Sequence, residues 1–440
     1  AMGKLTFKGG VHPFDGKEFS KDKPIKELLP EGDMVFPLSQ HIGAPAVPVV
    51  AKGDHVLAGQ LIAEAGGFIS ANIHSSVSGT VKAIEPRTLA TGGKCNSIII
   101  ENDGKYEEVE YVKTKFEDLT NDMIREKVKA AGVVGMGGAG FPANVKITPK
   151  DPEAIDYVIV NGAECEPYLT SDYRRLLEEP EKVVMGLKIV LKLFDKAQGV
   201  IAIEDNKPEA LAVMEKACAG EDRISVKVMK TKYPQGGERF LISAVTGREI
   251  NASMLPADAG CIVHNVDTVT SIYFACIEGF PLTKRIVTVT GDGVKEPQNF
   301  YVYLGMNFRQ LLDAAGGPVG EPEKYISGGP MMGFAMYSLD VPVVKGSSSL
   351  LVLQKDPVKD LKASAYNSCG KCGEACPEHL LPAKLAVLAS KGRIEEFEKL
   401  DGVECVECGS CSFTCPAKRP LAQYIKSMRK QVLANRRKKK

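Results

Sequence analysis

The sequence predicts a multi-domain α/β protein that begins with a small β-rich domain and ends with a helical, cysteine-rich domain. Three observations support this prediction. Short strand-like runs between glycine and aspartate turns fill residues 1–105, strands and helices alternate from 117 to 315, and seven of the 12 cysteines lie between Cys369 and Cys415. A length of 440 residues is enough for about three domains.

Composition and charge exclude several classes of protein. Hydrophobic residues make up 44% and charged residues 25%, as in ordinary globular proteins. The formal net charge of +1 gives no indication of nucleic-acid binding. No apolar run approaches the ~20 residues of a membrane-spanning helix, and no signal-peptide pattern stands at the start. With many unpaired thiols, these features predict a cytosolic protein.

Residues 1–105 are expected to form a small β-sandwich. Val47–Ile62 forms one half of a repeated pattern and Ile69–Val81 forms the other. The pattern resembles the barrel-sandwich fold of biotinyl and lipoyl carrier domains. Those carriers present a lysine at a hairpin tip, but the corresponding stretch, Ser70–His74, has none. We therefore expect a docking or structural role, with His74 as a structural histidine rather than a ligand.

A glycine-rich segment, Gly135-Met-Gly-Gly-Ala-Gly-Phe-Pro142, follows a predicted helix over residues 117–131. It formally contains G-x-G-x-x-G, but a Rossmann fingerprint requires a preceding strand, so that motif is excluded. Glycines leave backbone N–H groups uncovered, so a flat ring or a phosphate can approach closely, with Lys146 in reach of a phosphate. A flexible linker is the alternative, which the flanking Val133-Val134 disfavours.

Between residues 157 and 278, alternating strands and helices predict a doubly wound parallel sheet. We expect strands at Tyr157–Val160, Gly199–Ile203, Ile224–Met229 and Cys261–Asn265. We expect helices over residues 178–194, 208–219 and 240–245, and from 266 to about 278. Residues 285–330 then predict a β-β-α unit of the β-grasp type.

Two of these strands end in polar loops, Asn161–Pro167 and Glu204–Lys207. Ligands bind at the carboxyl ends of strands in such sheets, so these side chains could hold ribose hydroxyls; solvated loop ends are the alternative. The turn Tyr233–Arg239 precedes a helix and could offer its amides to an anion.

The last domain is predicted from two cysteine motifs. They read Cys369-x2-Cys372-x3-Cys376-Pro377 and Cys405-x2-Cys408-x2-Cys411-x3-Cys415-Pro416. The second is the bacterial ferredoxin pattern for a four-iron cluster, and the first is that pattern with one cysteine missing. In two-cluster ferredoxins the cysteine before the proline ligates the other cluster. We therefore group Cys376 with Cys405, Cys408 and Cys411, and Cys415 with Cys369 and Cys372.

The spacing places the missing ligand at Tyr366. That cluster could use a non-cysteine ligand, carry a solvent-derived one, or contain three irons. Structural zinc fits seven cysteines with two Cys-Pro endings poorly, and disulfides do not suit a long chain without a secretory signal. Residues 380–400 between the motifs are expected to be helical. For the basic end, residues 426–440, a frayed and solvated tail is favoured over a surface for anionic lipid or an acidic partner.

Taken in this order, the glycine loop, the Asn161–Pro167 loop and the Gly236–Glu238 turn are similar to the flavin- and NADH-binding subunit of respiratory complex I. With the opening run Thr6–Pro13, the barrel-sandwich halves and the cluster motifs, nearly the whole chain resembles the RnfC family, a component of the Rnf complex, which is a membrane-bound ferredoxin:NAD oxidoreductase. The resemblance implies bound FMN, with NAD(H) stacked over it, and two iron–sulfur clusters. It implies these contact residues for flavin and nucleotide: Gly135, Gly137, Gly138, Gly140, Lys146, Asn161, Glu164, Glu166, Asn206, Gly237 and Glu238.

The resemblance also implies partners and a location. These are membrane-integral subunits, a ferredoxin-like iron–sulfur subunit and, indirectly, ferredoxin, at the cytoplasmic face of the membrane. The alternatives are a cobalamin-reducing flavin and iron–sulfur NADH reductase, and an electron-transfer scaffold without flavin. The implied domains are a barrel-sandwich domain (1–115), an FMN/NAD-binding α/β domain (116–283), a β-grasp module of the SLBB type (284–345), a two-cluster domain (355–425) and the basic tail (426–440).

Overall fold

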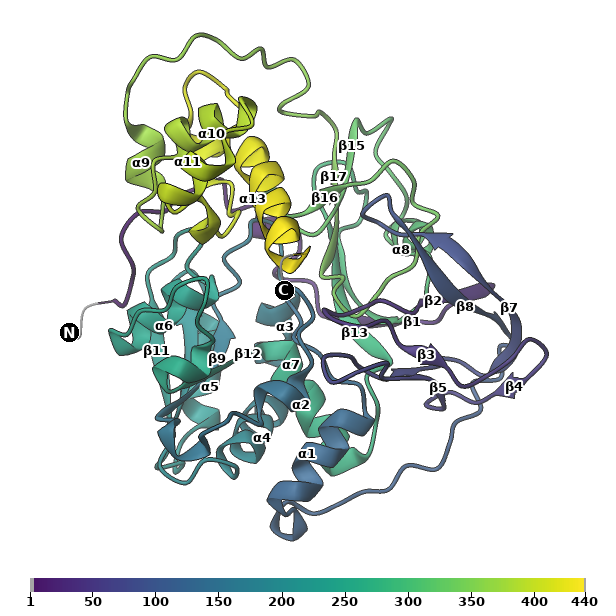
Figure 1. Ribbon diagram of the computed structural model, residues 1–440. Helices are drawn as coiled ribbons and strands as arrows, with labels where there is room; N and C mark the ends of the chain where they lie inside the picture. The colour runs from purple at the N-terminus through teal and green to yellow at the C-terminus, as the bar shows by residue number, and fades with distance from the viewer. Residues whose placement is uncertain (1–3, 439–440) are drawn as a thin grey trace.

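The computed structural model describes residues 4–438. The cysteine-rich helices lie at one end of the molecule, above the α/β layer, and the two β-rich parts lie beside that layer (Figure 1). Within residues 4–438, no helix combines the length and the apolar character needed to cross a lipid bilayer.

The predicted β-sandwich is confirmed between residues 33 and 102. One sheet has the order β2 (Asp33–Pro37), β8 (Lys94–Asn102), β7 (Gly79–Thr88) and β4 (His55–Val56), and the other joins β3 (Val47–Pro48), β5 (Leu61–Glu64) and β6 (Ile73–His74). Burial lowers the pKa of His74 to about 3, which agrees with a neutral, structural side chain.

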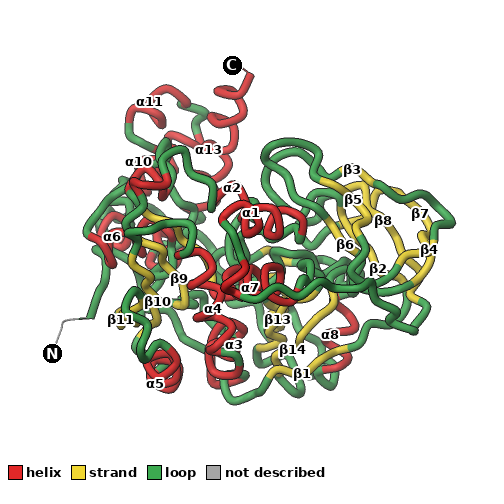
Figure 2. The backbone as a smooth tube through the Cα atoms, turned by 90° about the horizontal axis from the view of Figure 1, so that it is seen from below, coloured by secondary structure: helices red, strands yellow, loops and turns green. Residues whose placement is uncertain are grey.

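Residues 4–28 do not join the sandwich. Leu5 bridges to Met229 and Val11 to Tyr233, and β1 (Ile25–Leu28) pairs in parallel with β14 (Gln298–Tyr303). The resulting six-stranded sheet has the order β1-β14-β13-β17-β15-β16. Figure 2 shows β1, β14 and β13 side by side. Its other strands are β13 (Lys284–Thr290), β17 (Ser349–Leu353), β15 (Lys324–Ser327) and β16 (Phe334–Ala335), and α8 (Phe308–Ala314) follows β14. The sheet therefore takes strands from both sides of the predicted range 284–345.

The four predicted parallel strands are confirmed. The sheet has the order β11 (Ile224–Met229), β10 (Gln198–Glu204), β9 (Tyr157–Gly162) and β12 (Cys261–Asn265). Helices α4 (Pro180–Leu191), α5 (Pro208–Ala217) and α7 (Val266–Tyr273) share a core with one face, and α6 (Glu238–Thr246) packs on the other. The helix predicted over residues 178–194 is observed as α4, which begins at Pro180 because proline lacks the N–H that a helix interior needs but suits the first turn. A separate helix that was not predicted, α3 (Ser171–Glu178), ends just before it.

The cysteine-rich part is helical, as predicted. It contains α9 (Lys371–Ala375), α10 (Pro382–Ser390), α11 (Ile394–Lys399), α12 (Ser410–Thr414) and α13 (Leu421–Lys438). The helix predicted over residues 380–400 is two helices, separated at Gly392, which has φ +67°. This left-handed conformation suits glycine and ends α10.

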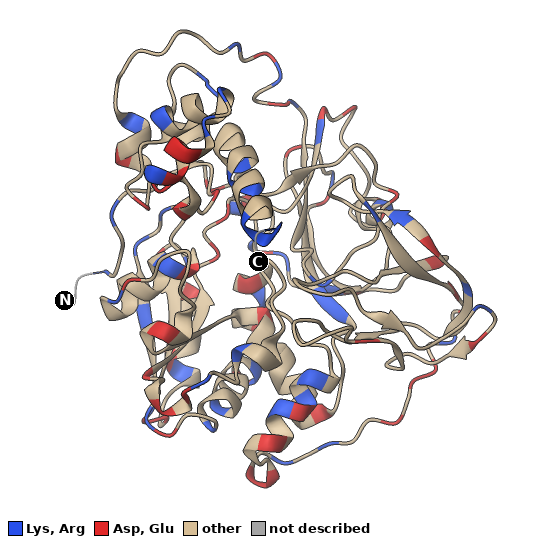
Figure 3. Cartoon of the chain, in the orientation of Figure 1, with Lys and Arg blue, Asp and Glu red and all other residues tan. Residues whose placement is uncertain are grey.

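The frayed tail predicted for residues 426–440 is wrong up to residue 438. Helix α13 buries Leu421, Ile425, Met428 and Val432, whose spacing places them on one face against α10. Its Lys and Arg positions are blue along the ribbon in Figure 3. Two of its arginines, Arg429 and Arg436, pair with acidic residues of the same domain. Lys439 and Lys440 lie outside the described residues.

Candidate functional site

The glycine-rich segment is a closed loop between α1 (Asn121–Ala130) and α2 (Ala143–Lys146). The Gly135 N–H donates to the Phe141 carbonyl over 2.8 Å, and the Ala143 N–H donates to the Val133 carbonyl over 2.9 Å. Gly137 and Gly140 have φ values of +82° and +75°, which side chains other than glycine rarely adopt. These bonds give the loop a defined shape, so the alternative of a flexible linker does not hold.

The loop lies against the junction of β12 and α7. The Met136 N–H donates to Thr268 Oγ1 over 2.8 Å, and a Cβ atom at Gly137 would lie 3.2 Å from Asn265 Nδ2. A Cβ at Gly138 would have no heavy atom within 4 Å, so this side of the loop is open. Asn265 was not among the predicted contacts, although it ends a strand of the same sheet as Asn161, and the rule that selected Asn161 would also have found it.

Several predicted residues meet at the carboxyl edge of this sheet. Asn161 Nδ2 donates to the Gly236 carbonyl over 2.8 Å, and Lys146 Nζ lies 2.7 Å from both Glu238 Oε1 and the Val263 carbonyl. Gly237 precedes α6, where a Cβ would lie 2.6 Å from the Phe240 ring. The tertiary structure therefore brings Lys146, Asn161, Gly237 and Glu238 together.

Glu164 and Glu166 bind backbone amides of the protein itself. The Glu164 carboxylate accepts from the N–H groups of Asp172 and Tyr173 at the start of α3, over 2.7 and 3.2 Å. Glu166 Oε1 accepts from the N–H groups of Met331 and Met332, over 2.9 and 2.8 Å. Both carboxylates hold their loop in place, and direct contact of either with a nucleotide stays a prediction.

Two buried lysines contact the Asn161–Pro167 loop: Lys17, which the sequence did not single out, and Lys207, which belongs to the predicted polar loop Glu204–Lys207. Lys17 Nζ donates to the carbonyls of Glu164, Glu166 and Leu169. Lys207 Nζ donates to the Ala163 carbonyl over 2.7 Å and to Asn206 Oδ1 over 2.9 Å. Burial lowers the pKa of Lys17, which the nearby Glu164 carboxylate opposes. The lysines fix the carbonyl side of the loop, while Asn206 Nδ2 is buried without a hydrogen-bond partner among the described residues.

The Glu166 carboxyl is expected to make stability depend on pH. Burial raises its pKa from 4.5 to about 7, although the Met331 and Met332 amides oppose the shift. Between these values the folded chain binds more protons here than the unfolded chain, so stability falls as pH rises from about 4.5 through 7. We expect Glu166→Gln to raise the free energy of unfolding at pH 8 by on the order of 3 kcal/mol, which appears as a higher urea midpoint than that of the parent. At pH 4.5 the two urea midpoints should be similar.

The control for this experiment is Glu110→Gln, because Glu110 is exposed. It is expected to leave the urea midpoint unchanged at both pH values. A Glu166→Gln variant that differs from the parent equally at pH 4.5 and pH 8 would contradict the assignment of the raised pKa to Glu166.

The first predicted cysteine set is gathered in the interior of the helical part. Burial raises the pKa of the Cys411 thiol to about 12, with further contributions from Cys408, Cys405 and Cys376. The Leu380 N–H lies 3.4 Å from Cys376 Sγ, and the Glu407 N–H lies 3.4 Å from Cys405 Sγ. Backbone amides that point at cysteine sulfurs help to set the reduction potential of iron–sulfur clusters. The four cysteines with these amides therefore fit an iron–sulfur cluster.

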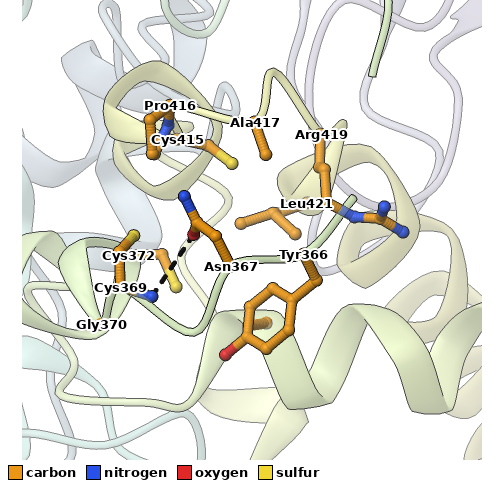
Figure 4. Close-up of a pocket in the computed structure, with 11 residues that line it drawn as sticks. Tyr366, Asn367, Cys369, Gly370, Cys372, Cys415, Pro416, Ala417, Arg419 and Leu421 are labelled. Carbon is orange, nitrogen blue, oxygen red and sulfur yellow. Dashed lines mark hydrogen bonds between the residues drawn. The ribbon is translucent and has the colours of Figure 1, made fainter. Parts of the chain in front are cut away.

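The second predicted set, Cys369, Cys372 and Cys415, lines a small hollow with Tyr366 (Figure 4). Within residues 4–438, no three His, Cys, Asp or Glu side chains are placed to hold a single metal ion. In a four-iron cluster each thiolate binds a different iron, so its sulfurs need not converge on one point. The assignment of both cysteine sets as ligands stays a prediction.

The first set lies next to the strand-end loops. Cys408 belongs to a small buried core with Val11, Tyr233 and Ala375, and Cys165 packs against this core. The Tyr233 hydroxyl donates to the Cys408 carbonyl over 2.8 Å, and the Gly236 N–H lies 3.2 Å from Cys165 Sγ. The opening run Thr6–Pro13 passes through this contact region. In the second set, by contrast, Cys369 is exposed.

Comparison with known proteins agrees with these parts. Residues 5–105 match the RnfC barrel sandwich hybrid domain, residues 128–274 the Nuo51 FMN-binding domain, and residues 286–335 the SLBB domain. The RnfC-type component of the proton-translocating ferredoxin:NAD(+) oxidoreductase complex of Clostridium ljungdahlii is 47% identical over 97% of this chain and 94% of its own length. The chain belongs to the RnfC family.

A second member of the RnfC family, from the Na(+)-translocating ferredoxin:NAD(+) oxidoreductase complex of Acetobacterium woodii, is 43% identical over 98% of both chains. The member from the ion-translocating oxidoreductase complex of Rhodobacter capsulatus is 37% identical over 90% of this chain and 77% of its own length. The family resemblance expected from the sequence is thereby confirmed, and with it an oxidoreductase complex as the setting of the chain.

Proposed function

We propose that the chain binds FMN on the glycine loop, exchanges hydride with NAD(H) there, and passes single electrons through two iron–sulfur clusters. The observation that supports this most is the juxtaposition of an open glycine loop, polar strand ends and a buried cysteine set. The edge fits a flat, polar cofactor, since Gly138 faces open space and the Asn206 amide has no partner among the described residues. A bound flavin supplies the conversion between an electron pair and single electrons.

In this proposal the residues of the chain bind and orient. The backbone N–H groups of the glycine loop, together with Asn161 and Asn265, would hold the flavin, and Lys146 would place positive charge beside its phosphate. Asn206 would contribute its free amide. Lys17 and Lys207 would keep the Asn161–Pro167 loop from moving, because they bind its carbonyl groups from beneath. Preorganisation of this kind is what a protein adds to cofactor chemistry.

We infer that the two clusters act in sequence. The set Cys376, Cys405, Cys408 and Cys411 would hold the cluster nearer the flavin, because Cys408 shares a core with Cys165 and Tyr233. The set with the exposed Cys369 would hold the outer cluster, where a partner protein can dock. The relatives are named as subunits of proton- and Na(+)-translocating complexes. We propose membrane-integral subunits and a ferredoxin-like iron–sulfur subunit as partners, at the cytoplasmic face of the membrane.

An anaerobic absorption spectrum of the purified, cluster-reconstituted chain, with flavin and iron assays, tests the function. We expect about one flavin and roughly eight irons per chain at most, and bleaching of the flavin band by NADH. Iron–sulfur absorbance without flavin, and without a response to NADH, would favour the alternative of an electron-transfer scaffold.

Cysteine substitutions test the order of the clusters. We expect Cys408→Ser to lose about half of the cluster iron. NADH should then leave the remaining outer cluster oxidised, because electrons pass from the flavin to the outer cluster through the inner one. Cys415→Ser, the matched variant in the outer set, is expected to retain an inner cluster that NADH reduces. Electron paramagnetic resonance after addition of NADH measures the reduction of the remaining cluster in each variant. Equal behaviour of the two variants would contradict the order.

A further inference from the structure

The segment around Tyr366 is fixed against the loop that carries Cys415. The Ser364 N–H donates to the Ala417 carbonyl over 2.9 Å, and Arg419 Nη1 donates to the Ser364 carbonyl over 3.2 Å. These bonds place the backbone of position 366 at the rim of the hollow that Cys369, Cys372 and Cys415 surround (Figure 4). The backbone is therefore near where a fourth cysteine ligand is expected, although the side chain is not a thiol.

The Tyr366 side chain does not complete this ligand set. In Figure 4 its ring lies below the three sulfur atoms and does not enter the space between them, and the residue is 58% exposed. The phenol oxygen of tyrosine lies much farther from its Cα atom than the sulfur of cysteine does, because the rigid ring stands between them. A backbone at the distance that suits a cysteine ligand is therefore too close to the cluster for a tyrosine oxygen to bind. Tyr366 thus stands where the motif requires a ligand, but its side chain has the wrong length to bind the cluster.

Asn367 lies between the three sulfurs, and its Oδ1 accepts from the Cys369 N–H over 3.4 Å. The residue is exposed, so its side chain can turn outward when a cluster is inserted. A neutral amide is a poor ligand for iron in a sulfur-rich cluster, which soft thiolates hold. Neither side chain therefore replaces the missing thiolate.

We propose that the outer set holds a four-iron cluster in which one iron has no protein ligand and exchanges with the solution. This rests on the proposed function only in requiring that the outer set binds a cluster. The chemistry follows from the ligand count. A dicationic 4Fe-4S core gives one electron to an oxidant such as ferricyanide, releases Fe²⁺ and leaves a monocationic 3Fe-4S core. A reductant with added Fe²⁺ reverses the step.

The location of the cluster makes this exchange accessible. Cys369 is exposed, and so is every residue from 361 to 370. The inner set has all four cysteines, three of which are buried, so it is expected to keep its irons under the same conditions. The outer cluster is thereby the part of the chain that responds to oxidants.

The test is a ferricyanide titration of the full-length, reconstituted chain, followed by iron analysis and electron paramagnetic resonance. We expect the parent to release about one of roughly eight irons and to develop the signal of an oxidised three-iron cluster, since the oxidised four-iron cluster is silent. Fe²⁺ with dithionite is expected to restore the iron and remove the signal. Tyr366→Cys is expected to retain all irons and to stay silent.

Tyr366→Phe is the second variant, because it removes the phenol oxygen and keeps the ring. We expect it to behave like the parent, and a greater iron loss than in the parent would show that Tyr366 is a ligand and overturn the proposal. Full retention of iron by the parent, or only about four irons before oxidation, would overturn it as well. Flavin content and bleaching by NADH, measured on the same samples, report separately on the proposed function.

Discussion

Gly138→Phe is expected to produce a folded chain that retains its iron and loses its flavin. A Cβ at this position meets no heavy atom within 4 Å, and Gly138 is not among the glycines with positive φ, so the fold accepts a side chain there. The phenylalanine ring would extend into the open face on which we place the flavin. Steric conflict of about 1–3 kcal/mol weakens binding roughly five- to 150-fold. Flavin per chain after gel filtration, and bleaching by NADH, measure the effect.

Gly93→Phe is the matched control. A Cβ at Gly93 would meet only Thr91 Oγ1, at 3.8 Å, and Gly93 also lacks a positive φ and is exposed; it lies in the turn between β7 and β8 of the β-sandwich. It is expected to keep both flavin and iron. If Gly138→Phe binds flavin as well as Gly93→Phe does, the cofactor is not held on this face of the loop.

Asp267→Asn is expected to destabilise the α/β domain by about 3–5 kcal/mol. Asp267 is 3% exposed, and its carboxylate lies 3.0 Å from Arg175 Nε and 3.8 Å from Arg285 Nη2, both of which are also buried. Removal of this charge leaves the buried Arg285 guanidinium without its ion-pair partner and leaves Arg175 paired only with Glu179, and breaking such a buried network costs more than the pair itself contributes. Asp267 follows Asn265 by two residues, so the loss also loosens the wall of the glycine loop.

The urea midpoint of the purified chain measures this change. Asp340→Asn is the control, because the Arg309–Asp340 pair has the same 3.0 Å geometry but side chains that are 54% and 62% exposed. A screened surface pair contributes at most about 1 kcal/mol, so the control should differ little from the parent. Equal shifts in the two variants would contradict a special role for the buried network.

The sequence by itself determined the parallel strands, the glycine loop and the cysteine spacing. These features are local. A run such as Val158-Ile-Val160 alternates between two buried faces of the sheet, and the turn residues on either side limit its length. The cysteine motifs are likewise set by short intervals, because three thiolates on one turn must reach neighbouring irons. Family membership followed from these local signals taken in order.

Only the tertiary structure decided what supports the site. Lys17 binds a loop about 150 positions away, β1 joins a strand more than 270 positions away, and α13 folds back over α10. No local pattern encodes these contacts, since each depends on how distant segments cross. The same holds for Tyr366: the spacing identified a missing ligand, but only the folded segment beside Ala417 showed that the tyrosine ring lies outside the space between the sulfurs. A residue is a ligand only if its donor atom lies within bonding distance of the metal, and the packing of the side chain decides that distance.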